Sequence, residues 1–121
     1  GPAPETRFVL LGDANLDPAD SDGRQDAIRG LLSDPRLQDP APKGMGGRDA
    51  ANTSQEGDPM LDTADWTDPS PGNLRVDYVL PSRDWTVESA GVHWPAGDGV
   101  LAMDARTASR HHLVWVDLAL P

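Results

Sequence analysis

Apolar residues in this chain gather into a few short runs that are separated by polar segments rich in glycine and proline. Short runs made of branched and aromatic residues are typical of buried or half-buried strands. They predict strands over residues 7–11, 74–80, 86–94 and 111–120, and the alternation of apolar and polar positions is clearest in the last run. Strands therefore outweigh helices in the predicted fold.

One helix is expected over residues 24–33, where apolar side chains recur at spacings of three and four. Oxygen-bearing side chains at 20–22 are suited to cap its first turn, and Pro35 ends it. The residues expected to form its buried stripe are Ala27, Ile28, Leu31 and Leu32.

Residues 38–72 show no sustained periodicity and are rich in Pro, Gly, Asp and Ser. This composition predicts a long irregular loop, which Met60, Leu61 and Trp66 are expected to anchor. A loop of this length inside a compact domain usually has a function of its own or is disordered.

The predicted sheet has one face that a single helix does not cover. Alternation places Arg75 and Asp77 on the same face of one strand, and His111, Leu113 and Trp115 on the same face of another. An open sheet of four or five strands with one packed helix leaves the opposite face bare, so that face needs a partner.

The composition limits the class of protein. A chain of 121 residues forms at most one small domain, and its 12 Gly and 12 Pro make it rich in loops. Although only 37% of the residues are apolar, their dense clustering excludes general disorder. No apolar run is long enough to cross a membrane, and no signal peptide is recognisable.

Acidic residues outnumber Lys and Arg by 20 to 10, which gives a formal net charge of −10. Such a charge repels nucleic acid unless a basic patch or bound cations reverse it, and the chain has no basic run. Nucleic acid is therefore not favoured as a partner. The absence of cysteine excludes disulfides, thiolate zinc sites and thiol catalysis. It is compatible with a secreted, periplasmic or cytoplasmic protein.

Four polar side chains lie within or directly after apolar strands: Asp13, Asn15, Asp77 and His111. Packing gives no reason for them there, because burying an unpaired charge is costly. Structural interpretations remain open beside a functional one. Asp13 and Asn15 suit an Asx turn, and Asp77 could form a surface ion pair with Arg75.

A calcium loop is a further alternative, because Asp13, Asn15 and Asp17 stand at alternate positions. The EF-hand pattern, however, requires Gly at the position of Pro18 and Glu at the position of Arg24.

The remaining histidines, His112 and His93, are weaker candidates for a functional site. His111 and His112 alternate faces, so a regular strand cannot direct both to one metal ion. We expect His112 to be structural or to lie at a sheet edge, and His93 to serve packing.

Three motifs occur in a fixed order: GDAN at 12–15, RVDYVLPS at 75–82 and SRHHLV at 109–114. They resemble the last three motifs of the endonuclease/exonuclease/phosphatase family of metal-dependent phosphoesterases. That family includes DNase I-like nucleases, sphingomyelinases and inositol polyphosphate phosphatases. The resemblance runs from about Phe8 to the end of the chain.

The resemblance implies an α/β (α+β) fold, since the family domain is a four-layer sandwich of two packed sheets with helices outside. Residues 1–121 would form the C-terminal part of one such domain. They would supply about half of it, mainly one mostly antiparallel sheet with one packed helix and long loops. The bare face would be covered by the N-terminal half of the domain or by a second copy of the chain.

The resemblance also implies a role for each site residue. Asp13 would orient and deprotonate the attacking water and could ligate a metal, and Asn15 would hydrogen-bond the phosphate or assist the metal. Asp77 would pair with His111 and fix its tautomer, while His111 would bond a non-bridging phosphate oxygen. The expected cofactor of the complete domain is Mg²⁺, with Mn²⁺ or Ca²⁺ as alternatives. In-line attack on phosphate requires such a positioned water, cation and donors.

Two residues depart from the family pattern. Arg110 stands where the family usually has an Asp that contributes to metal binding, and Leu113 replaces a usual Pro. One hypothesis is that Arg110 binds the substrate as a fixed cation that supplies part of the missing metal charge. The other hypothesis is that the active site has decayed.

The expected function is therefore that of a fragment of a divalent-metal-dependent phosphoesterase, acting on a phosphodiester or phosphomonoester. We expect this chain alone to be inactive, because the upstream metal-binding Glu of the family is not in it. The alternatives are a non-catalytic binding module of the same fold and a small acidic calcium-binding domain.

Overall fold

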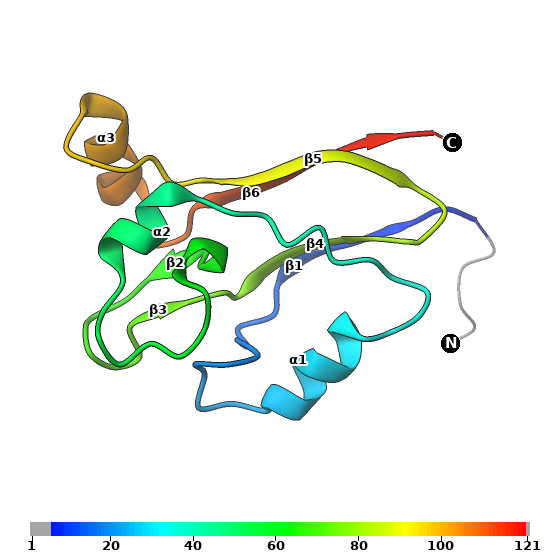
Figure 1. Ribbon diagram of the computed structural model, residues 1–121, viewed down its shortest axis with the longest axis horizontal. Coiled ribbons are helices and arrows are strands. Elements are labelled where there is room, and N and C mark those ends of the chain that lie inside the picture. Colours follow the sequence, from blue (N-terminus) through cyan, green and yellow to red (C-terminus); the bar gives the residue numbers. More distant parts are fainter. Residues whose placement is uncertain (1–5, 121) are drawn as a thin grey trace.

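The computed structural model describes residues 6–120, which fold into short helices and antiparallel strands (Figure 1). In chain order the elements are β1 (Val9–Asp13), α1 (Gln25–Leu32), α2 (Met45–Ala50), the 3-10 helix η1 (Pro59–Leu61), β2 (Ala64–Asp65), β3 (Asn73–Leu74), β4 (Asp77–Pro81), β5 (Thr86–His93), α3 (Val100–Ala108) and β6 (Leu113–Ala119). The α+β class is confirmed.

The strands form three antiparallel pairs, β1–β4, β2–β3 and β5–β6. In Figure 1 the β1–β4 and β5–β6 pairs extend across the molecule, with α1 below them and α2 and α3 at one end. Isolated bridges join Leu37 to Ser82 and Ala64 to His111. The expected single sheet is thus divided into three ladders, and the second bridge connects the middle of the chain to the segment before β6.

Helix α1 was predicted correctly, and it packs on the β1–β4 pair. The cluster beneath it consists of Ile28, Leu37, Tyr78 and Leu80, with Phe8, Leu16, Leu31 and Leu32 packed around it. Two details of the prediction were wrong. Ala27 is exposed, and the N-cap residue is Arg24, which makes no side-chain cap. Asp20 instead accepts hydrogen bonds from the backbone of Glu56 and Gly57, so it holds a distant loop.

The strand predicted over 74–80 is interrupted, because Arg75 and Val76 are both buried. The Arg75 guanidinium makes two hydrogen bonds to Asp39, of 2.8 and 2.6 Å, and lies over the Tyr78 ring. Two successive residues that are both buried break the regular alternation between β3 and β4. From Asp77 onward the predicted alternation is correct, with Tyr78 and the other even-numbered positions buried.

The pairing of β5 with β6 agrees with the predicted strands, except for the position of the irregularity. The register shifts between Val87 and Ser89, and not at Gly91, where a bulge had been expected. Gly91 has a different role, because a Cβ atom there would lie 2.7 Å from the Trp115 ring. The residue lets the indole cross the neighbouring strand closely.

The segment 38–72 is more ordered than its composition suggested, since it contains α2, η1 and β2. Its expected anchors Met60, Leu61 and Trp66 are half-buried. Helix α3 was not expected. No helix in residues 6–120 is long and apolar enough to span a membrane.

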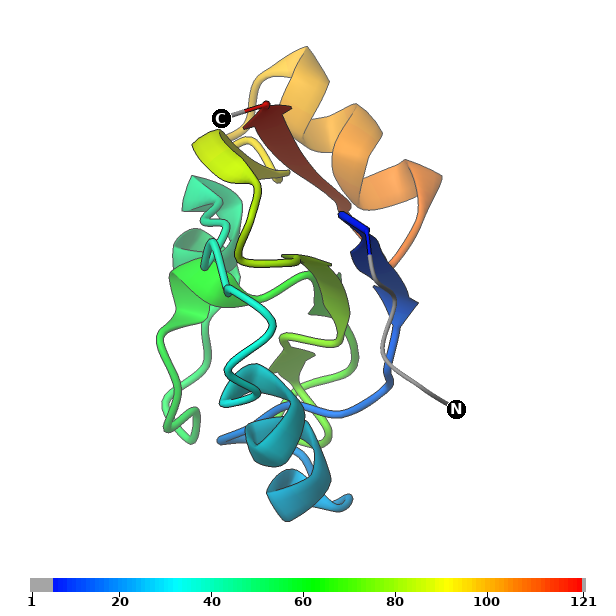
Figure 2. The same cartoon turned by 90° about the vertical axis from the view of Figure 1, so that its right-hand side faces the viewer.

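The bare sheet face expected from the sequence is present. Leu11 on β1 and Leu113 and Trp115 on β6 are 69%, 68% and 40% exposed. Figure 2 shows β1 and β6 on the same side of the molecule. A groove of about 240 Å³ lies between β1, β4 and β6, and its lining includes Leu11, Leu113 and the two carboxylates Asp13 and Asp77.

Candidate functional site

Asp77 and His111 meet where β4 begins and just before β6 begins. The Nδ1 atom of His111 lies 2.8 Å from Oδ2 of Asp77, and both side chains are partly buried. A backbone bridge to Ala64 holds the main chain at His111. Because Nδ1 faces the carboxylate, Nε2 is the ring nitrogen left for a ligand or substrate.

Thr63 holds the carboxylate from the other side, although the sequence analysis did not identify it. Its Oγ1 donates a 2.8 Å hydrogen bond to Oδ2 of Asp77 and accepts from the backbone N–H groups of Val76 and Asp77. Thr63 is only 1% exposed, and its carbonyl accepts a hydrogen bond from His112. Next to it, Trp66 lies edge-on to His111 at 5.5 Å between ring centroids. No periodic pattern in this segment could have revealed these contacts.

Asp13 is brought to the same place by strand register, since it is the direct partner of Asp77 in the β1–β4 ladder. Its Oδ1 accepts a 2.7 Å hydrogen bond from the backbone of Asn15, whose φ is 49°. The Asx turn considered from the sequence is therefore real. Asn is one of the few residues that adopts this left-handed conformation readily, which gives it a conformational role beside any chemical one.

Asp13, Asp77 and His111 each offer a ligand atom, and these atoms all lie within 4.8 Å of one another. Two carboxylates and an imidazole are ligands suited to a divalent cation. The donor set therefore fits the kind of metal that the sequence motifs imply, without fixing which ion it is.

Arg110 is exposed and lies opposite Asp65, whose backbone N–H donates a 2.9 Å hydrogen bond to the Arg110 carbonyl. Burial raises the pKa of Asp65, and the positive charge of Arg110 partly opposes that rise. The Arg110 side chain makes no hydrogen bond or ion pair within residues 6–120. Asn15 is also exposed.

The contacts exclude the surface ion pair that was considered for Asp77, and they show what the neighbouring Asp17 does. Asp77 does not pair with Arg75, because the guanidinium of Arg75 is bound to Asp39. Asp17 is buried and accepts hydrogen bonds from three backbone N–H groups, those of Ala19, Asp20 and Arg75. Its carboxylate thus anchors the loop after β1.

The other histidines differ from each other. His112 is buried and stacks on Trp94 at 3.9 Å between ring centroids, as expected for a structural residue. Burial, reinforced by the nearby His111 and His93, lowers the pKa of His112 to about 4. His93, which was expected to pack, is exposed.

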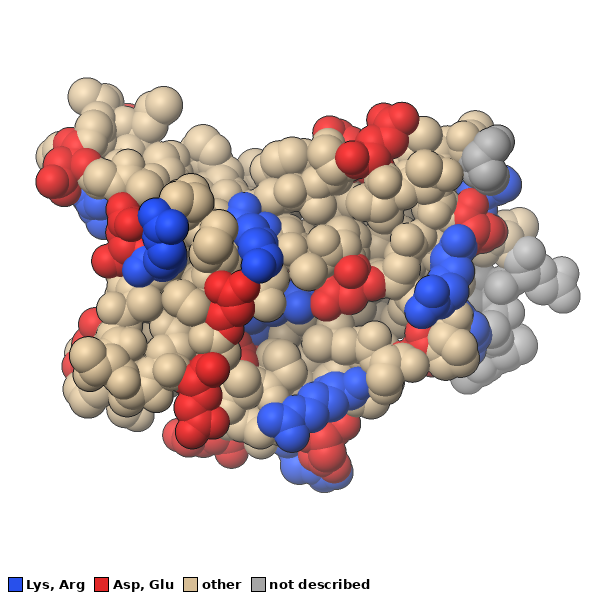
Figure 3. Space-filling model, viewed as in Figure 1, with Lys and Arg blue, Asp and Glu red and all other residues tan. Residues whose placement is uncertain are grey.

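Charged side chains are interspersed on the face shown in Figure 3, with acidic and basic groups side by side. Most of the basic groups form ion pairs: Arg7 with Asp84, Arg24 with Asp26, Arg36 with Asp34, Lys43 with Asp58, Arg75 with Asp39 and Arg106 with Asp98. The surplus of acidic residues also affects the pKa of a buried carboxyl group. Burial raises the pKa of Asp62 to about 7, and repulsion from Asp17 and Asp20 adds to the rise.

No curated protein sequence and no solved structure matches this chain. Its sequence matches the profile of the Endonuclease/Exonuclease/phosphatase family over residues 1–111, a range that includes all the residues of the Asp13, Asp77 and His111 cluster. The match covers more than half of the chain, and the motifs that carry the resemblance meet in one site. The chain therefore belongs to the endonuclease/exonuclease/phosphatase family.

Proposed function

We propose that Asp13, Asp77 and His111 form the catalytic centre of a metal-dependent phosphoesterase, which hydrolyses a phosphodiester or phosphomonoester with an activated water. The observation that carries the proposal is the 2.8 Å hydrogen bond between Asp77 and His111, beside a second carboxylate that strand register holds in place. A site that combines a base with a cationic donor is suited to phosphoryl chemistry.

Each residue has a task that its position supports. Asp13 is exposed at the end of β1 and accepts the proton of the attacking water. Asp77 holds the His111 ring through Nδ1, so that the cationic ring donates from Nε2 to a non-bridging phosphate oxygen, where negative charge develops. Asn15 donates its side-chain amide to the same phosphate.

Asp13 and Asp77 would also hold part of a divalent cation's ligand set, and Mg²⁺ is the ion we propose, with Mn²⁺ or Ca²⁺ as alternatives. When bound, the cation polarises the phosphate oxygens and favours ionisation of a bound water. Two side chains do not complete the coordination of such an ion. We propose that its remaining ligands come from outside this chain.

We further propose that this chain supplies one sheet of the family's two-sheet domain. The exposed Leu11, Leu113 and Trp115 support this, because an apolar sheet face of this kind is normally packed. The other sheet, or a second copy of the chain, would cover the face and the groove that contains Asp13 and Asp77. On this basis the chain alone is inactive.

The test is hydrolysis of bis-p-nitrophenyl phosphate and p-nitrophenyl phosphate, with and without Mg²⁺. It compares the chain alone with a protein that joins it to the other sheet of the family fold. We expect activity only in the joined protein, with losses of about 10²–10⁴-fold in kcat for Asp13→Asn and His111→Gln. The control Asp104→Asn, an exposed position on α3, should keep full activity. Metal-dependent hydrolysis by the chain alone would overturn the divided domain.

A second candidate is a non-catalytic binding module of the same fold, and Arg110 is the observation that favours it. The position of a metal-binding carboxylate holds a cation, which repels a metal. If the joined protein is inactive and Arg110→Asp gains Mg²⁺-dependent hydrolysis, the site is a decayed one. If the joined protein is active and Arg110→Asp lowers kcat, the arginine contributes to phosphate binding.

A further inference from the structure

Asp62 is a buried carboxylic acid that takes no part in the proposed catalysis. It directly follows η1 and is only 2% exposed. Its side chain has one hydrogen-bond partner within residues 6–120, Gln55, whose Nε2 atom donates to Oδ2 of Asp62. Within the same residues it forms no ion pair with a Lys, Arg or His side chain. A carboxylate buried without a cation is costly, so the charge state of this group has to be explained.

The side-chain amide of Gln55 also lacks a hydrogen bond. Its Oε1 atom is buried and accepts no hydrogen bond in the part of the chain that the structure describes. Because Oε1 and Nε2 belong to one planar amide group, and Nε2 is bonded to Asp62, the unpaired oxygen lies beside the same carboxyl group. Turning the amide over would only bring Oε1 against Oδ2 of Asp62, where two acceptors face each other. In either orientation, a proton on Asp62 supplies the missing donor.

The charges around Asp62 favour its protonated form. The neighbouring groups that act on it are the carboxylates of Asp17, Asp20 and Asp58. Asp17 is itself buried, and Asp58 is paired with Lys43 at 2.6 Å. Burial raises the pKa of Asp62 to about 7, and repulsion from the three carboxylates adds to the rise, although the hydrogen bond from Gln55 opposes it.

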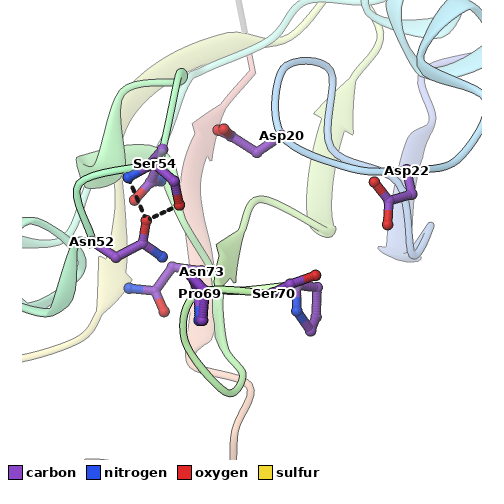
Figure 4. Close-up of a pocket in the computed structure, with 9 residues that line it drawn as sticks. Asp20, Asp22, Asn52, Ser54, Pro69, Ser70 and Asn73 are labelled. Atoms are coloured by element: carbon purple, nitrogen blue, oxygen red, sulfur yellow. Dashed lines mark hydrogen bonds between the residues drawn. The ribbon is translucent and has the colours of Figure 1, made fainter.

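The contact between Gln55 and Asp62 ties the loop between α2 and η1 to the residue that follows η1. Before Gln55, the loop is shaped by Asn52, whose Oδ1 accepts hydrogen bonds from the backbone N–H and the hydroxyl of Ser54 at 2.9 and 2.7 Å (Figure 4). After Gln55, two backbone N–H groups of the loop donate to Asp20. The bond to Asp62 lies between these two attachments.

We propose that Asp62 and Gln55 form a proton-dependent lock on the loop between α2 and η1. In the protonated form, the O–H of Asp62 donates to Oε1 of Gln55 while Nε2 of Gln55 donates to the other carboxyl oxygen, so the acid and the amide share two hydrogen bonds. When Asp62 loses its proton, one of these bonds is lost and a buried carboxylate faces three others. The loop is therefore fastened below neutral pH and loosens above it. The lock does not depend on the proposed catalytic chemistry.

The raised pKa of Asp62 gives the direction of its effect on stability. The pKa is about 4 in the unfolded chain and about 7 in the folded chain, so between these values the folded state binds more protons. The stabilisation is fully present below about pH 4 and is lost as pH rises through about 7. The contribution of His112 has the opposite sign, and it is common to all proteins that keep this histidine.

The direct test is an NMR titration of the Asp62 carboxyl carbon in the unmodified chain between pH 4 and pH 9. We expect a midpoint near pH 7, with the side-chain amide signals of Gln55 changing over the same range. Hydrogen-exchange protection of the loop between α2 and η1, corrected for intrinsic exchange rates, should fall as pH rises from 6 to 8.5. A carboxyl midpoint near pH 4 would overturn the proposal, as would protection that does not change with pH.

The variant Asp62→Asn tests the role of the proton, because the asparagine amide keeps both hydrogen bonds to Gln55 at every pH. From pH 5 to pH 8.5 the unfolding constant of the unmodified chain, measured with urea, should rise by about tenfold or more relative to that of the variant. The control Asp104→Asn removes an exposed charge on α3 and should keep the pH dependence of the unmodified chain. Parallel pH dependence of the unmodified chain and Asp62→Asn would overturn the lock. Equal effects of Asp62→Asn and Asp104→Asn would show a general charge effect and would overturn it as well.

Discussion

Thr63 has no catalytic role in the proposed mechanism, but its hydroxyl hydrogen-bonds the Asp77 carboxylate that contacts His111. The valine variant Thr63→Val keeps the shape but removes the hydrogen bond to Asp77 and leaves two backbone N–H groups unpaired. We expect a loss of about 1–3 kcal/mol in the free energy of unfolding. In the protein that joins this chain to the second sheet, we expect kcat to fall by about tenfold or more, because Asp77 and His111 would no longer be held in position.

The measurements are urea unfolding and the pH profile of kcat, with Thr63→Ser as the matched control. Serine restores the hydroxyl, so its kcat and the pH profile should approach those of the unmodified protein. If serine performs no better than valine, the hydroxyl does not position Asp77.

His112 makes stability depend on pH. Its pKa is about 4 in the folded chain against about 6.5 in the unfolded chain, so between these values the unfolded state binds more protons. Stability is therefore fully present above about pH 6.5 and is lost as pH falls toward 4. By pH 5 the loss amounts to about 2 kcal/mol.

The variant His112→Phe keeps an aromatic ring on Trp94 and removes the titration. Urea unfolding at pH 7.5 and pH 5 should show that it escapes this loss, while the opposite contribution of Asp62 is common to both proteins. Parallel losses of stability in the two proteins would contradict the assignment to His112.

The site residues differ in how far the sequence reveals them. Asp13, Asp77 and His111 are visible because each lies within or next to an apolar run, where packing alone would not place a charge. Thr63 is not visible, because it acts through a contact across 14 residues from an aperiodic segment. Local patterns identify the reactive groups more readily than the residues that hold them.

At the scale of elements, α2 is fixed by close approach to η1. A Cβ atom on Gly47 would lie 2.2 Å from the carbonyl oxygen of Pro59, and the backbone of Gly44 donates to Met60 at 2.8 Å. Gly47→Ala must therefore displace backbone, and we expect it to lower the free energy of unfolding by about 1–3 kcal/mol.

Gly30 on α1 is the matched control, because a Cβ atom there meets nothing within 4 Å. Gly30→Ala should raise stability by about 0.5–1 kcal/mol, since alanine is the better helix former. Urea unfolding of both variants measures the difference. Equal effects of the two substitutions would mean that the contact between α2 and η1 is loose.

The same elements show where sequence patterns lose information. Helix α1 was predictable because it buries a stripe against β4, whereas α2 contains two glycines and no such stripe. Helix α3 buries only Ala102 and leaves Val100 and Leu101 exposed, so its apolar residues follow no single face. Short helices held by tertiary contacts give little periodic signal.

At the scale of the whole molecule, the proposed divided domain would explain both the exposed apolar face and the small number of candidate metal ligands. Both are expected if a second sheet packs on β1 and β6 and brings further ligands to Asp13 and Asp77. The sequence predicted this bare face, because a single packed helix covers only one face of an open sheet of several strands.

Substitution of Leu113 tests whether a second sheet packs on β6, because this side chain is 68% exposed in the chain alone. Leu113→Gln should change the free energy of unfolding of the chain by less than about 0.5 kcal/mol, as at other exposed positions. In the joined protein the same leucine would be buried, and the substitution should cost about 1.5–3 kcal/mol. Glu88→Gln, at an exposed position on β5, serves as a control that should change neither protein. Urea unfolding of both proteins supplies the comparison, and an equally small effect of Leu113→Gln in each would mean that the second sheet does not pack on β6.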